Sequence, residues 1–78
     1  NPKQKNLAFA LMFIDKVLES DKEVDFETRL ELENSVRGLN DKDILLQWQK
    51  FTSAKNEIDA QGEVKNLLRL VIQKAQAN

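Results

Sequence analysis

The sequence contains no cysteine, no histidine and no tyrosine in 78 residues. Without cysteine the chain forms no disulfide and no thiolate metal site, and without histidine it lacks the commonest metal ligand and acid–base group. The remaining hydroxyl nucleophiles are those of serine and threonine, none of which has an activating base beside it in the sequence. We therefore predict a protein that is not an enzyme and that has no cofactor, no metal and no evident small-molecule substrate.

Glycine and proline are also scarce, with two and one respectively, whereas strong helix formers are abundant. This composition favours long helices with short connections, and so short a chain cannot build two independent cores. We expect a single helical domain over residues 1–78, folded as a small all-α four-helix bundle. Its helices are predicted at about residues 3–19, 26–37, 41–60 and 63–76.

Several residues mark the predicted helix ends. Asn1 followed by Pro2 is typical of an N-cap with proline in the first turn, and Asp25 is a good N-cap for the second helix. Gly38 is expected to end the second helix, because glycine tolerates a left-handed backbone. Asp21 and Glu23, which precede Asp25, are interpreted as part of a solvated loop.

The junction between the second and third helices carries two further signals. Asn40 is expected to cap the third helix, with Asp43 reaching back in a capping box. Leu39 and Ile44 bracket this cap as a hydrophobic staple. The link between the two helices is therefore predicted to be tight.

The third helix is expected to bury one stripe, formed by Ile44, Trp48, Phe51, Ala54 and Ile58. Beyond Gly62 this period reverses, because Val64, Leu67 and Val71 fall on the opposite side at about 100° per residue. We expect a turn at residues 60–64, and a single long helix bent there is the alternative.

The first helix is apolar on more than one side, because residues 7–14 read LAFALMFI. The expected buried stripe has spacings of four, three and four and consists of Leu7, Leu11, Ile14 and Leu18. Phe9 and Phe13 lie nearly opposite that stripe. Such an apolar surplus indicates a second buried contact, with either a partner protein or another copy of the chain.

The predicted function is a non-catalytic protein–protein interaction or oligomerisation module, of the kind found in regulatory domains and homodimers. It would dock through the first helix, assisted by the last. Its expected anchors are the apolar side chains that a single stripe does not account for, namely Phe9, Met12, Phe13 and Leu70.

Charge is unevenly distributed along the chain, although the net charge is −1. Residues 15–33 hold eight acids and three bases, a net charge of −5, whereas residues 44–78 hold five bases and three acids, a net charge of +2. Solvated helix faces explain this pattern. The alternative is head-to-tail or antiparallel docking of an acidic edge against a basic edge, which would set orientation more than affinity.

A small nucleic-acid-binding domain is the alternative function. Lys65, Arg69 and Lys74 provide basic groups on the last helix, and binding through them would weaken steeply with added salt. The helix–turn–helix reading of residues 33–50 is disfavoured, because Asp41 and Asp43 would meet phosphates at the start of the second helix.

The chain begins Asn1–Pro2 without an initiator methionine, and we expect a piece excised from a longer protein. No signal peptide is visible, and the apolar run falls far short of the roughly 20 residues that cross a membrane. We expect a cytoplasmic location and no membrane span.

Overall fold

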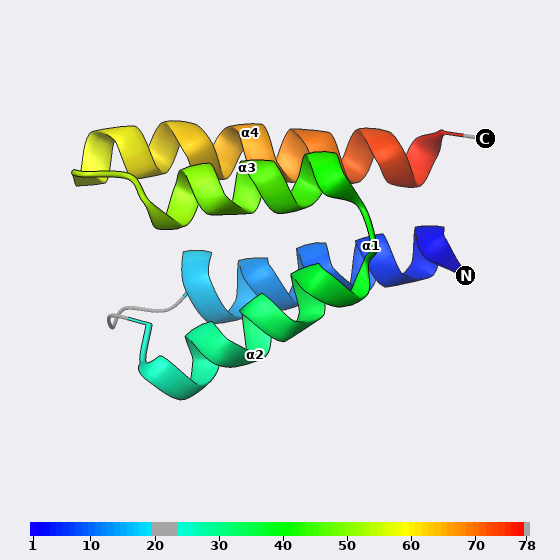
Figure 1. The fold of residues 1–78 in the computed structure, drawn as a ribbon, viewed down its shortest axis with the longest axis horizontal. Coiled ribbons are helices and arrows are strands. Elements are labelled where there is room, and N and C mark those ends of the chain that lie inside the picture. The colour runs from blue at the N-terminus through cyan, green and yellow to red at the C-terminus, as the bar shows by residue number, and fades with distance from the viewer. Residues whose placement is uncertain (20–23, 78) are drawn as a thin grey trace.

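The computed structural model describes residues 1–19 and 24–77, which form an all-α four-helix bundle (Figure 1). The predicted fold class is thereby confirmed. Helix α1 (Pro2–Phe13) continues into a five-residue π-helix, η1 (Ile14–Leu18). The remaining helices are α2 (Phe26–Gly38), α3 (Lys42–Thr52) and α4 (Glu57–Gln76). The loop predicted at Asp21 and Glu23 lies outside the described residues.

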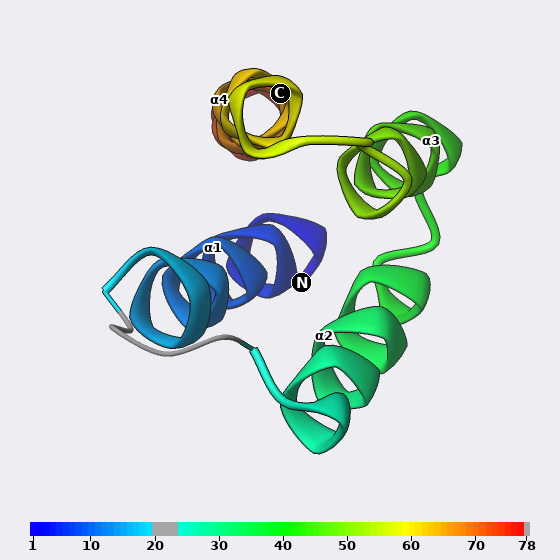
Figure 2. The same ribbon diagram turned by 90° about the vertical axis from the view of Figure 1, so that its left-hand side faces the viewer.

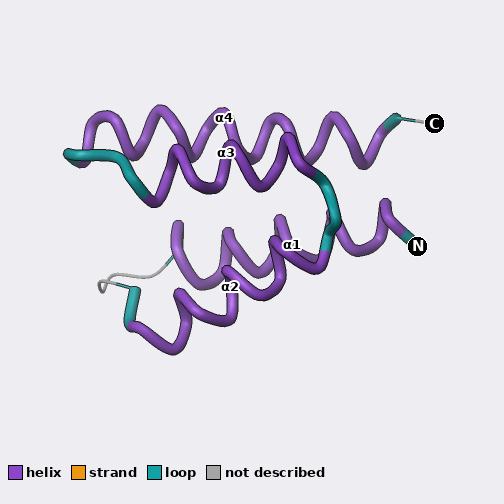
Figure 3. Tube along the Cα trace, viewed as in Figure 1, coloured by secondary structure: helices purple, strands orange, loops and turns teal. Residues whose placement is uncertain are grey.

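The helices follow one another in alternating directions, and α1 also runs antiparallel to α4 (Figure 1). Viewed end-on, they occupy four corners around a common core, with α1 next to α2 and α4 (Figure 2). Short connections join α2 to α3 and α3 to α4 (Figure 3). This is the up-down-up-down order expected when consecutive helices are joined by short loops.

The starts of α1 and α2 are those that the sequence predicts. The Asn1 side chain accepts a hydrogen bond from the Lys3 backbone N–H at 2.9 Å, with Pro2 in the first turn. Asp25 accepts one from the Thr28 N–H at 2.7 Å. Both caps satisfy donors that a helix N-terminus leaves without an intrahelical partner.

The junction between α2 and α3 differs from the prediction. Asp41 caps α3, because its Oδ1 accepts from the N–H groups of Asp43 and Ile44 at 3.0 and 3.1 Å. Asn40 instead adopts the left-handed backbone, with φ of 54°, and Gly38 remains within α2. Asparagine tolerates this conformation, and a carboxylate interacts favourably with a helix N-terminus. The predicted Asn40–Asp43 capping box is therefore wrong.

The boundary between the last two helices also differs from the prediction. Helix α3 ends at Thr52, and α4 begins after Asn56, whose side chain accepts from the Asp59 N–H at 2.8 Å. Helix α4 continues through Gly62, so the predicted turn at residues 60–64 and the bent helix are both wrong. One exposed glycine costs a helix only about 1 kcal/mol, which packing elsewhere along α4 overcomes.

Every helix contributes to one apolar core, whose buried side chains are Phe9, Ala10, Phe13, Leu32, Val36, Ile44, Trp48, Leu67 and Val71. Ile58 does not continue the stripe of α3, since it lies on α4 and is 81% exposed. Among residues 1–19 and 24–77, no helix has both the length and the apolar character needed to cross a bilayer.

Candidate interaction surface

Phe9 and Phe13 lie at the centre of the core, where their exposed fractions are 1% and 0%. Their ring centroids are 6.1 and 6.2 Å from that of Trp48, with the rings nearly perpendicular. Phe51 completes the cluster, with its ring 5.4 Å from Phe13. Aromatic rings favour such edge-to-face contacts. The expectation that these two phenylalanines form an outward docking surface is therefore wrong.

The opposite side of α1, continued by η1, faces outward instead. Leu7, Leu11 and Leu18 are 52%, 61% and 47% exposed, and Ile14 is half-buried. The leucine stripe expected in the core is thus on the surface, and the two faces of the helix are exchanged. We call Leu7, Leu11 and Leu18, together with Ile72 of α4, the leucine face.

The exchange has a physical reason. Because residues 7–14 are apolar on all sides of the helix, the 3.6-residue period gives no preference between the two stripes. The choice depends on the neighbouring helices, since Trp48 and Phe51 of α3 offer edges and faces that the rings of Phe9 and Phe13 can contact. The aromatic residues on the predicted third-helix stripe were the available signal for this packing.

The other two predicted anchors do not share a surface with each other. Met12 is half-buried on the flank of α1 toward α2, where its Sδ accepts from the Ser35 hydroxyl at 3.7 Å. Leu70 is half-buried against the core on α4. The four predicted residues therefore support the bundle rather than form one outward patch.

Helix α4 extends the leucine face. Two polar side chains of α4 point toward α3, since Glu63 accepts from Gln47 at 2.9 Å and Lys74 donates to Asp41 at 2.8 Å. Ile72 lies roughly half a turn around the helix from Lys74, and α1 packs on that other flank of α4. Ile72 is 41% exposed, so it continues the apolar surface of α1 onto its neighbour.

A basic row borders this surface. Lys65 and Arg69 are exposed, one helical turn apart, and lie beside Leu68 and Ile72 on α4. No described acidic side chain lies within ion-pair distance of either.

Lys74 is separated from that row. Its Nζ lies 2.8 Å from Asp41 and 2.9 Å from Asp43, so it links the C-terminal end of α4 to the N-terminal end of α3. These hydrogen bonds raise the pKa of Lys74 above its ordinary value. Burial works against ionisation of Asp41, but the bonds from Lys74 and the Ile44 N–H outweigh it and lower the pKa of Asp41. Lys74 thus fastens the two helices together.

A second exposed apolar row lies on α2. Phe26 is 76% exposed and Leu30 is 48% exposed, although both are large apolar side chains on the same helix as the buried Leu32 and Val36. Only Leu32 and Val36 reach the core. We call Phe26 and Leu30 the α2 face. The sequence indicates that this row is exposed, because it continues at spacings of three and four into the charged residues Glu33 and Arg37.

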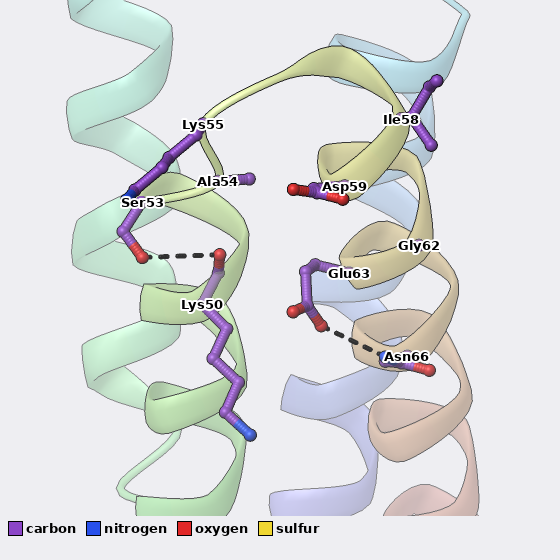
Figure 4. Close-up of a pocket in the computed structure, with 9 residues that line it drawn as sticks. All are labelled: Lys50, Ser53, Ala54, Lys55, Ile58, Asp59, Gly62, Glu63 and Asn66. Atoms are coloured by element: carbon purple, nitrogen blue, oxygen red, sulfur yellow. Dashed lines mark hydrogen bonds between the residues drawn. The ribbon is translucent and has the colours of Figure 1, made fainter.

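An open cleft of about 530 Å³ lies between the end of α3 and the start of α4 (Figure 4). The Ser53 hydroxyl in this cleft donates to the Gln49 carbonyl at 2.7 Å. Hydrogen bonds from Gln47 and then Asn66 lower the pKa of Glu63, which keeps this carboxylate ionised. Neither group is arranged as an activated nucleophile or a general acid.

Within the described parts of the chain, no group of three or more acidic side chains is placed to hold a metal ion. Comparison with protein-family models, with curated proteins and with solved structures found no match for this chain.

Proposed function

We propose that this chain is a non-catalytic self-association module that docks through the leucine face. The observation that carries the proposal is the exposed row Leu7, Leu11 and Leu18 on a helix whose other side already fills the core. Large apolar side chains gathered on one face are typical of interaction surfaces, whereas isolated ones are ordinary.

The chemistry of the chain supports a non-catalytic role. Histidine, cysteine and tyrosine are absent from the sequence, and the Ser53 hydroxyl is engaged by a helix carbonyl. The strongest described ionic cluster, Lys74 with Asp41 and Asp43, joins two helix ends. These groups act as structural links in the bundle.

Nucleic-acid binding through Lys65, Arg69 and Lys74 is the weaker alternative. Lys65 and Arg69 are exposed, but Lys74 is held by two carboxylates that would repel phosphate. Retention of the protein on DNA or RNA at low salt, lost as salt is raised, would favour this alternative over self-association.

The test is sedimentation equilibrium of the wild type and of Leu11→Gln over a range of concentrations. The wild type should show an average mass above 9.0 kDa that rises with concentration, and Leu11→Gln should remain at 9.0 kDa. The matched control is Leu46→Gln, because Leu46 on α3 is 58% exposed and Leu11 is 61% exposed. This control should associate like the wild type.

Circular dichroism should show equal helicity for all three proteins, since both substitutions are on the surface. A wild type that stays at 9.0 kDa at the highest concentration would overturn the proposal. So would equal association of Leu11→Gln and the wild type.

A further inference from the structure

The α2 face carries an acidic row beside its apolar one. Glu27 and Glu31 are exposed and lie one helical turn apart, next to Phe26 and Leu30. Glu31 also lies 3.5 Å from Lys16 of η1, in a pair whose side chains are 50% and 44% exposed. Such an exposed pair is weak, so Glu31 remains able to meet another cation.

The α4 edge of the leucine face has the same layout with the opposite charge. Lys65 and Arg69 lie one turn apart, beside Leu68 and Ile72. Leu68 is half-buried against the core and Ile72 is 41% exposed, so the apolar row of α4 is less exposed than that of α2. Both surfaces nevertheless place an apolar row beside a row of like charges, with the members of each row four residues apart. The two surfaces also lie on different sides of the bundle, since α1 and α4 occupy one side and α2 and α3 the other (Figure 2).

The order of the two rows around each helix decides how the surfaces match. At about 100° per residue, the charged row follows the apolar row in the same rotational sense on α2 and on α4. When two such helices pack antiparallel, the charged row of one faces the charged row of the other, and the two apolar rows also face each other. In that arrangement Glu31 of one copy faces Lys65 of the next, and Glu27 faces Arg69.

We propose that the leucine face of one copy binds the α2 face of a second copy, so that the molecules associate head to tail. This inference rests on the proposed function and adds the second surface. Phe26 and Leu30 would pack on the leucine face, while the acidic row covers the basic row. Because the two surfaces differ, the contact does not close on itself and produces chains or rings.

The remaining charged groups at these surfaces are compatible with this orientation. Asp15 of η1 lies on the edge of the leucine face away from α4, and therefore away from the incoming acids. On α2, Arg37 is held by Glu33 at 2.7 Å. The opposed rows thus set the direction of docking, and the apolar rows exclude water from it.

The test uses two variants that each lose one surface, Leu11→Gln on the leucine face and Leu30→Gln on the α2 face. Head-to-tail association predicts that each variant alone is monomeric at 9.0 kDa in sedimentation equilibrium. An equimolar mixture should form a heterodimer of twice that mass and nothing larger, because each copy retains one working surface.

Charge exchange gives an independent measurement. The pair Lys65→Glu/Arg69→Glu and the pair Glu27→Lys/Glu31→Lys should each weaken association at least tenfold. Mixing the two proteins should restore association into alternating chains or rings, because each surface of one variant then has the opposite charge to the surface it meets on the other. Leu46→Gln serves again as the control that keeps wild-type association.

The outcomes separate this inference from the proposed function. If the wild type and Leu30→Gln associate equally while Leu11→Gln is monomeric, the leucine face binds itself symmetrically and the head-to-tail arrangement is overturned. If the wild type is monomeric at every concentration, the proposed self-association fails, and the head-to-tail arrangement fails with it.

Discussion

The Trp48 indole donates a hydrogen bond to Glu33 Oε1 at 2.7 Å, and the other oxygen of the same carboxylate accepts from Arg37 Nε at 2.7 Å. Trp48 is only 1% exposed, so its polar N–H would be buried without a partner if Glu33 were absent. Glu33 of α2 thereby connects the aromatic core to the surface, and it fixes α2 against α3.

This relationship predicts the effect of changing Glu33. Glu33→Ala should lower the free energy of unfolding by about 1–3 kcal/mol, because the indole N–H loses its acceptor. Glu33→Gln keeps an acceptor oxygen and should lose less. Urea unfolding followed by fluorescence of Trp48, the single tryptophan, measures both. Equal stability of the alanine and glutamine variants would contradict the role given to this bond.

The exchange of the two faces of α1 predicts opposite outcomes for two large-to-small substitutions. Phe13→Ala should destabilise the bundle by about 3–5 kcal/mol, because it opens a cavity beside Trp48. Leu11→Ala should change the stability by less than about 0.5 kcal/mol, since Leu11 is mostly exposed. Urea denaturation of the two variants, at a concentration where the wild type is monomeric, distinguishes them. A larger loss at Leu11 would restore the face assignment made from the sequence.

Gly62 offers a stabilising substitution. It lies inside α4, and a Cβ added there would meet no atom within 4 Å. Gly62→Ala should therefore stabilise the protein by roughly 0.5–1 kcal/mol, through better helix propensity and a less flexible unfolded chain. Gln61→Ala, at an exposed neighbouring position, is the control for a change without a glycine. A lower melting temperature for Gly62→Ala would show that the helix does not pass straight through this residue.

The ionic cluster at the α3 N-terminus predicts how stability depends on pH. Asp41 has a folded-state pKa below its ordinary value of 3.8, so its contribution is present above that value and is lost as the pH falls through the folded pKa. The pKa of Lys74 is raised above 10.5, so its contribution is complete below that pH and is lost as the pH rises through the raised value.

With no histidine in the chain, the free energy of unfolding should change little between about pH 5 and 9. It should decrease at pH values lower than about 4. Urea unfolding at pH 7, 5 and 3 measures this fall. Asp41→Asn keeps a good N-cap but removes the ion pair, so its curve should be flatter in acid. Asp25 and Glu63 also have lowered pKa values and should supply the acid sensitivity that remains. If Asp41→Asn lost as much stability at low pH as the wild type, the contribution assigned to Asp41 would be contradicted.

The parts of the fold that the sequence predicts correctly depend on local chemistry. Asn1 and Asp25 cap their helices because a short polar side chain before a helix reaches the first N–H groups in almost any fold. The helical class follows in the same way from residue propensities. These features require no knowledge of which helices are neighbours.

The incorrect predictions concern features that depend on which helices pack against one another. Phe9 and Leu7 are both large and apolar, and the contacts that the neighbouring helices offer, such as that of Phe9 with Trp48, determine which of them is buried. In the sequence alone, Gly62 is typical of a helix break. The cap at Asn56 places the start of α4 before it, and the helix continues through Gly62. For the same reason the candidate surface lies on the side of α1 opposite to the predicted one. The spacing of apolar residues defines a stripe but does not determine whether that stripe faces the core or the solvent.

The alternating order of the helices has a consequence for folding kinetics. The pairs α1–α2, α2–α3 and α3–α4 join consecutive helices, so each can form after closing only a short loop. The contact between α1 and α4 joins opposite ends of the chain, and its entropic cost grows with the length of the loop that it closes. Rapid folding is expected of such a topology, with the docking of α1 onto α4 as its most expensive ordering step.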